Sequence, residues 1–198
     1  MKKSIITINT RELYFLEKYI IQNINSRNIG IMICLYTGIR LGEICALKWE
    51  DIDLVEQKIM ISKSVQRINE NGKSFTQIGV PKTSYSVREI PINNVLYKTL
   101  LIIKNTNGYV LTGTEKYLDP RTYQYYFKKL LKELNMKDYH FHVLRHTFAT
   151  RCVQSNVDIK SLSEILGHSS VNTTLNVYVH SSFSMKKTQL DKLKSVEL

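Results

Sequence analysis

The spacing of apolar residues changes period along this chain, and that change limits the possible folds more than any other feature. Residues 10–47 carry apolar side chains at helical spacing, residues 58–92 alternate between apolar and polar, and helical spacing returns from residue 119. Asn-Glu-Asn-Gly at 69–72 supplies a turn within the alternating block. The pattern predicts a mostly α fold with a small three-stranded antiparallel β-sheet (α+β) and no parallel sheet.

Start and stop signals place the helices more closely. Thr10 is expected to cap a first helix, a second covers about 28–36, and a third begins near Arg40. Asp119-Pro120 predicts another helix start, because proline is favoured directly after an N-cap. The other helices are expected at about 142–153, from Asp158 to Gly167, near 171–178 and near 184–195.

The charge balance favours a polyanionic partner. Lys and Arg number 28 against 17 Asp and Glu, and the formal charge of +11 is spread over both halves of the chain. Such an excess points to nucleic acid first and to an anionic membrane surface second, although a basic soluble protein without such a partner also fits. A hydrophobic content of 43% is typical of a globular domain and argues against a disordered basic tail.

Cysteine usage and hydropathy predict a cytoplasmic protein. Cys34, Cys45 and Cys152 form no paired framework, so reduced thiols are expected. The start of the chain is too short and polar for a signal peptide. The most apolar run, 29–39, is shorter than the roughly 20 residues that cross a membrane.

Polar residues recur in three segments at helix ends. Arg40 precedes Glu43 by three residues in TGIRLGE, His142 precedes Arg145 by three in HVLRHTFAT, and Tyr178 ends LGHSSVNTTLNVY. Taken singly, each arginine could be a solvated surface charge, and Tyr178 could be an amphipathic residue at the edge of the core. Together, two arginines can grip a phosphate, histidines can move protons, and a tyrosine surrounded by them can attack phosphorus.

A metal site is not expected, although His142 and His146 stand at a metal-like spacing of four. The glutamate of the HExxH pattern is missing between them, and no further ligand pattern accompanies them. The departing oxygen of a phosphodiester would need a proton from elsewhere, and Lys82 in VPKTSYSVREIPI is the candidate.

Four segments in this order resemble the catalytic domain of tyrosine recombinases, the phage-integrase family, over about residues 10–180. They are TGIRLGEICALKWEDID, PKTSYSVREIPI, HFHVLRHTFATRC and LGHSSVNTTLNVYVH. The resemblance implies the catalytic-domain fold of that family. It also implies that Tyr178 attacks the scissile phosphate, that a 3′-phosphotyrosyl link forms, and that Arg40 and Arg145 clamp the phosphate.

The remaining roles follow from the same resemblance. Lys82 would protonate the leaving 5′ oxygen, His142 would act as base or phosphate contact, and His168 would hydrogen-bond the phosphate. Glu43 would support the site without direct chemistry. The link conserves bond energy, so no metal, ATP or other cofactor is expected.

The function implied is site-specific DNA recombination by the integrase of a mobile element, acting on double-stranded DNA. Two alternatives stay open: a DNA-binding regulator that keeps the fold without cleaving, and a type IB topoisomerase-like enzyme that relaxes DNA. The family implies a tetramer on DNA for the full-length protein, while this chain without DNA is compatible with a monomer.

The domain prediction assigns residues 1–180 to the catalytic domain and 181–198 to a helical tail. The tail either packs on its own domain or docks on a neighbouring protomer. Family members usually carry a core-binding domain before the catalytic one. That domain is expected to be absent, so the chain is interpreted as a fragment or, second, as a short single-domain member.

Further phosphate contacts are predicted on basic residues outside the catalytic set, although a solvated basic face explains them nearly as well. These residues are Lys63, Arg67, Lys73, Arg121, Lys128 and Lys129.

Overall fold

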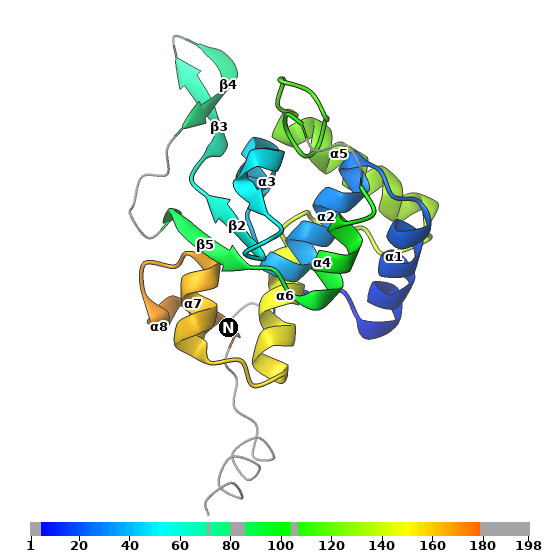
Figure 1. The fold of residues 1–198 in the computed structure, drawn as a ribbon, viewed down its shortest axis with the longest axis vertical. Helices are drawn as coiled ribbons and strands as arrows, with labels where there is room; N and C mark the ends of the chain where they lie inside the picture. Colours follow the sequence, from blue (N-terminus) through cyan, green and yellow to red (C-terminus); the bar gives the residue numbers. More distant parts are fainter. Residues whose placement is uncertain (1–4, 71, 80–85, 104–106, 179–198) are drawn as a thin grey trace, which may run out of the picture.

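The computed structural model describes residues 5–70, 72–79, 86–103 and 107–178, which form a mostly helical domain with two small antiparallel sheets (Figure 1). The helices are α1 (Thr10–Gln22), α2 (Ser26–Thr37), α3 (Leu41–Ala46), α4 (Asn94–Leu100), α5 (Pro120–Glu133), α6 (Val143–Gln154), α7 (Ile159–Leu166) and α8 (Val171–Tyr178), with a 3-10 turn at Trp49–Asp51. The strands are β1 (Ile52–Asp53), β2 (Lys58–Ile61), β3 (Ser64–Glu70), β4 (Lys73–Gly79) and β5 (Arg88–Pro91). The predicted class is confirmed.

The alternating block divides into two sheets. β2 pairs with β1 on one side and β5 on the other, with Ile59 opposite both Ile52 and Ile90. β3 and β4 form a separate ribbon that projects from the domain (Figure 1). The three-stranded sheet therefore takes its third strand from residues that precede the alternating block, which the period of the sequence did not indicate.

Helix α2 is the centre of the main core. Residues 29–35 are all buried, as expected for a helix that is apolar on every side. Helices α1, α4 and α6 contact it, and Gly30 allows Tyr123 of α5 and Leu111 to approach its backbone. Cys34 and Cys45 lie in this core as free thiols, as predicted.

Most of the predicted helix boundaries are confirmed, with one correction. Asn9, not Thr10, caps α1, because its side chain accepts the Glu12 backbone N–H at 2.9 Å. Asp119 caps α5 ahead of Pro120, as predicted. Helix α4, capped by Asn93, was not predicted.

Two further expectations concern the C-terminal segment and membrane insertion. The helix expected near 184–195, and the whole 181–198 tail, lie outside the described residues. Within the described part, none of the helices combines the length and the hydropathy that crossing a membrane requires.

A second, smaller core joins α6, α7 and α8. Ala149, Leu162, Leu166 and Tyr178 are buried in it together. Because Tyr178 is part of this core, its hydroxyl is brought against α6 by packing rather than by chain neighbourhood.

Candidate active site

The junction between α2 and α3 places the first arginine. Helix α2 ends at Thr37, and the Gly38 that caps it has a φ of 66°, the left-handed conformation that glycine adopts without strain. The chain then turns so that Arg40 is the N-cap of α3. Glu43 accepts the Arg40 backbone N–H at 2.7 Å and its guanidinium at 3.0 Å, so the predicted proximity of the two residues is confirmed.

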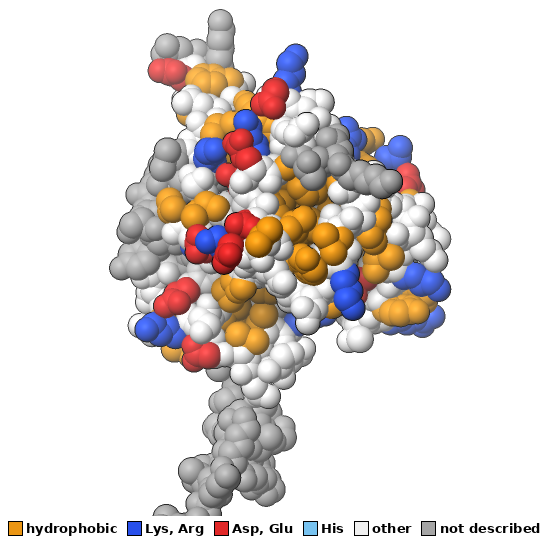
Figure 2. Space-filling model, in the orientation of Figure 1, with side chains coloured by type: hydrophobic (Ala, Val, Ile, Leu, Met, Phe, Trp, Pro, Cys, Tyr) orange, Lys and Arg blue, Asp and Glu red, His pale blue; other side chains and the backbone are white. Residues whose placement is uncertain are grey.

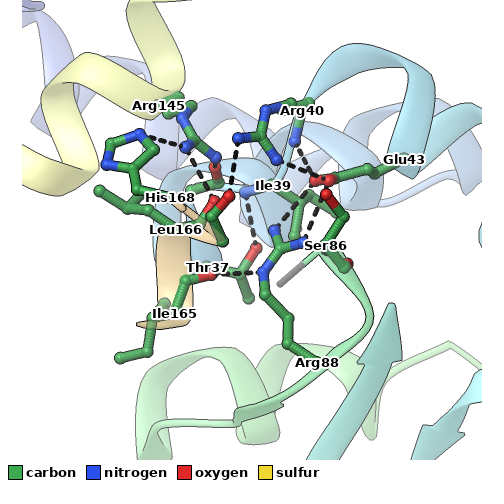
Figure 3. Close-up of polar contacts among 12 residues, drawn as sticks. Thr37, Ile39, Arg40, Glu43, Ser86, Arg88, Arg145, Ile165, Leu166 and His168 are labelled. Atoms are coloured by element: carbon green, nitrogen blue, oxygen red, sulfur yellow. Dashed lines mark hydrogen bonds and ion pairs between the residues drawn. The ribbon is translucent and has the colours of Figure 1, made fainter. Parts of the chain in front are cut away.

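Glu43 also forms a buried ion pair with Arg88 of β5 (Figure 3). Both carboxylate oxygens accept from the Arg88 guanidinium at 3.0 Å, and Arg88 Nε donates to the Ile165 carbonyl at 2.6 Å. Burial opposes ionisation of Glu43, but Arg88 and Arg40 outweigh it and lower the pKa of its carboxyl. Arg88 thus joins β5, α3 and α7.

Sequence reasoning missed Arg88, although a signal was present. In SVREIPI, Arg88 and Ile90 share one face of the alternating strand, and Ile90 is buried. An arginine on the apolar face of a strand implies a buried acidic partner.

Arg145 is almost fully buried and joins the ends of two helices. Its guanidinium donates to the Gly38 carbonyl after α2 and to the Leu166 carbonyl at the end of α7, both at 2.8 Å. Burial, helped by the charge of Arg40, lowers its pKa to about 10, so it stays cationic at neutral pH. Arg40 Nη2 donates to the neighbouring Gly167 carbonyl at 3.1 Å, which sets the two guanidiniums side by side (Figure 3).

His168 follows Gly167, whose left-handed φ of 64° ends α7 as predicted. Its Nε2 lies 2.9 Å from Arg145 Nη2 and its Nδ1 lies 2.8 Å from Thr174 Oγ1. A guanidinium cannot accept a hydrogen bond, so Nε2 must be the acceptor and Nδ1 carries the proton. Burial and the nearby arginines lower the pKa of His168 to about 4, which agrees with this neutral form.

The Tyr178 hydroxyl lies 2.9 Å from Nδ1 of His146. Burial raises the pKa of Tyr178, while the charges of Arg145 and Arg40 act in the opposite direction. The ring of His142, the N-cap residue of α6, lies 4.7 Å from that of His146. Loss of hydration and the neighbouring cationic groups lower the pKa of His142 to about 4.

The structure therefore brings together Arg40, Arg145, His142, His168 and Tyr178 from three separated segments. Lys82 falls outside the described residues. His146 was set aside at the sequence level as half of a metal-like pair, and only its contact with Tyr178 makes it part of the site.

Three of the other predicted phosphate contacts form ion pairs with carboxylates. Arg67 bonds Asp119, Lys128 pairs with Asp138, and Lys129 pairs with Glu133. Both lysines are on α5, which lies across the domain from α7 and α8 (Figure 1). Lys63 is partly buried and Arg121 is exposed, whereas the side chain of Lys73 is outside what the structure describes.

The face shown in Figure 2 does not concentrate the positive charge. Lysines, arginines and acidic residues are interspersed over its described part, and hydrophobic side chains gather over α4. Val95, Leu101 and Ile102 are the exposed apolar residues of that region. This face has neither the uniform sign nor the polarity of a nucleic-acid surface.

Comparison with known proteins identifies the family. The Phage integrase family model matches residues 9–185. The chain belongs to this family. A tyrosine recombinase XerC-like protein from Caldanaerobacter subterraneus subsp. tengcongensis is 32% identical over 170 residues, covering 73% of this chain and 43% of that protein. The ICEBs1 integrase of Bacillus subtilis (strain 168) is 29% identical over 175 residues, covering 81% and 46%. This integrase-family chain thus spans about half the length of these curated relatives.

Solved structures match over nearly the whole chain. The integrase of transposon Tn1549, in complex with transposon right end DNA, has a TM-score of 0.75 at 26% identity, covering 97% of this chain and 67% of that one. The catalytic domain of bacteriophage HP1 integrase has a TM-score of 0.63 at 22% identity, covering 96% and 95%. The tyrosine recombinase catalytic-domain fold expected from the sequence is therefore confirmed.

His168→Gln in this integrase-family chain is expected to reduce the loss of stability on acidification. The pKa of His168 is about 4 in the folded protein against 6.5 for the free side chain. As pH falls from 6.5 to 4, the unfolded chain takes up a proton that the folded protein does not, so the free energy of unfolding decreases across that window. Above pH 6.5 His168 carries no extra proton in either the folded or the unfolded state, so it causes no pH dependence there.

Urea unfolding at pH 7 and pH 4.5 measures this effect. The free energy of unfolding should decrease less between pH 7 and pH 4.5 in the variant than in the wild type. His142 contributes the same decrease to both proteins. Equal decreases in the two proteins would show that His168 is protonated in the folded state.

Proposed function

We propose that this chain is the catalytic part of a site-specific DNA recombinase, the integrase of a mobile genetic element. It cleaves and rejoins double-stranded DNA through a 3′-phosphotyrosyl intermediate with Tyr178 as nucleophile. The observation that carries this proposal is the position of the Tyr178 hydroxyl, which touches a histidine ring and is subject to the charges of Arg145 and Arg40. A phenol needs such a base and such cations to attack phosphorus.

The arginines are suited to the phosphate. A guanidinium has five N–H donors, and the bonds of Arg145 and Arg40 to described residues use only part of them. The remaining donors would hold the non-bridging oxygens, whose charge grows in the pentavalent transition state. Because both guanidiniums are anchored to carbonyls, little reorganisation is needed when DNA binds.

The other proposed roles surround this clamp. His168 would bond a phosphate oxygen after releasing Arg145 and gaining a proton. His142, at the start of α6, would act as base or phosphate contact, and Lys82 would protonate the leaving 5′ oxygen. Glu43 would hold Arg40 in place. Reversal of the same steps would rejoin the strands without ATP or a metal ion.

The likeness to named integrases supports the biological setting. One similar solved structure is a transposon integrase on transposon DNA, and one relative is named an ICEBs1 integrase. We propose that residues 1–180 form the catalytic domain and that the longer protein recombines DNA as a tetramer. The basic residues beyond the clamp would hold the backbone in a salt-dependent way.

The test is capture of a covalent adduct. The chain is mixed with a pool of nicked duplexes of randomised sequence, in EDTA and without ATP, so that the short strand released on cleavage diffuses away. Denaturing electrophoresis should show a protein–DNA adduct in the wild type and none in Tyr178→Phe, with the two proteins equally stable and equally able to bind the pool. Sequencing the trapped strands would give the preferred site.

Three results would contradict the proposal. Bound DNA without an adduct would favour a regulator that keeps the fold. Adducts without sequence preference, together with relaxation of any plasmid, would favour a topoisomerase-like enzyme. An adduct that persists in Tyr178→Phe would exclude Tyr178 as the nucleophile.

A further inference from the structure

The nitrogen that meets the Tyr178 hydroxyl belongs to His146, one helical turn after His142. The two atoms are 2.9 Å apart, within the range required of a general base and the proton it removes. The His146 and Tyr178 rings are 5.7 Å apart and inclined by 55°. The contact joins α6 to α8, so it depends on the packing of the small second core.

The surroundings of His146 favour a neutral ring in a fixed orientation. Its ring lies edge-on to that of His142, with an interplanar angle of 88°. Burial and the charge of Arg145 lower its pKa, so the ring is unprotonated at neutral pH. Nδ1 is the nitrogen that faces the hydroxyl, and in the tautomer with the proton on Nε2 it accepts the Tyr178 O–H.

We propose that His146 is a catalytic residue, the base that takes the proton of Tyr178 during strand cleavage. This inference rests on the proposed function. The Tyr178 O–H proton moves to Nδ1 of His146, the bond between Oη and phosphorus forms, and the bond between phosphorus and the 5′ oxygen breaks. The 5′ oxygen leaves with a proton from Lys82. In rejoining, the imidazolium returns its proton to the phenolate as the 5′ hydroxyl attacks.

A purely structural bond is the competing explanation, because a buried hydroxyl needs a partner in any protein. The two explanations differ in what a small external base can do. A hollow of about 380 Å³ is lined by residues including His142, His146 and Val143. It would admit imidazole to the space left by a truncated His146, where the imidazole could accept the proton.

The experiment measures single-turnover cleavage of the duplex recovered from the randomised pool. His146→Ala and His146→Asn are compared with the wild type and with His140→Asn, an exposed histidine on the adjoining loop. Asn places a polar atom near the position of Nδ1 but cannot take up the proton. Each rate is measured with and without imidazole, and on a substrate whose 5′ leaving oxygen is replaced by sulfur, which leaves without protonation.

We expect both His146 variants to bind DNA like the wild type and to cleave about 10²- to 10⁴-fold more slowly. Imidazole should restore part of the rate of His146→Ala, and the sulfur substrate should not. His140→Asn should cleave normally, and Lys82→Ala should be rescued by sulfur.

Other results would overturn the assignment while leaving the proposed function intact. Cleavage by His146→Asn at the wild-type rate would show that the contact is structural. Rescue of His146→Ala by sulfur would move His146 to the leaving-group side. Absence of any Tyr178-dependent adduct in the wild type would instead refute the proposed function itself.

Discussion

Replacing Glu43 with alanine is expected to lower the free energy of unfolding by about 3–5 kcal/mol, the usual cost of leaving one half of a buried ion pair without its partner. The Glu43 and Arg88 side chains are only 3% and 6% exposed and share two hydrogen bonds of 3.0 Å. Alanine removes both bonds and leaves the Arg88 guanidinium buried and uncompensated. Urea unfolding monitored by circular dichroism measures the loss.

Two comparisons isolate the ion pair as the cause. Glu43→Ala combined with Arg88→Met should be more stable than Glu43→Ala alone, because the unpaired charge is then gone. Glu89→Ala, which breaks the exposed pair with Lys58, should change stability little. If Glu43→Ala is as mild as Glu89→Ala, the pair is hydrated in solution.

Replacing Arg145 with lysine is expected to slow single-turnover cleavage by about 10²- to 10³-fold, the loss typical of removing one preorganised donor from a transition-state site. The guanidinium bonds the Gly38 and Leu166 carbonyls and the His168 ring at once. An ammonium group keeps the charge but lacks this planar fork, so it cannot hold these partners and face a phosphate together.

DNA affinity should change much less than the cleavage rate, because most of the binding energy comes from protein contacts with the other phosphates of the DNA backbone. Arg151→Lys is the matched control, since Arg151 lies on the same helix but pairs with Glu17 outside the site. It should cleave at the wild-type rate. Cleavage by Arg145→Lys within a few-fold of the wild type would show that charge alone suffices.

Local features of the fold were predictable because their causes are local. Asp119 with Pro120, and Asp158 with Gly167, encode helix ends through side chains and backbone conformations that need no distant partner. Strand partners were not predictable in this way. Pairing depends on which segments the packed helices bring together, and β1 was too short to show a period of its own.

The same division applies to the site. The pair of Arg40 and Glu43 could be predicted because three residues on a helix bring side chains to one face. Arg88, 45 residues away from Glu43 along the chain, could not be assigned as its partner before the fold was known.

The sequence alone determined the family, the fold class and the residue types for phosphate chemistry, because ordered motifs and hydrophobic periods are written in neighbouring residues. Only the tertiary structure decided which groups touch. It set the neutral tautomer of His168 through Arg145, buried Arg88 against Glu43, and placed His146 on the Tyr178 hydroxyl. Such contacts join residues far apart in the chain, and side-chain packing between helices, which no local pattern records, brings them within bonding distance.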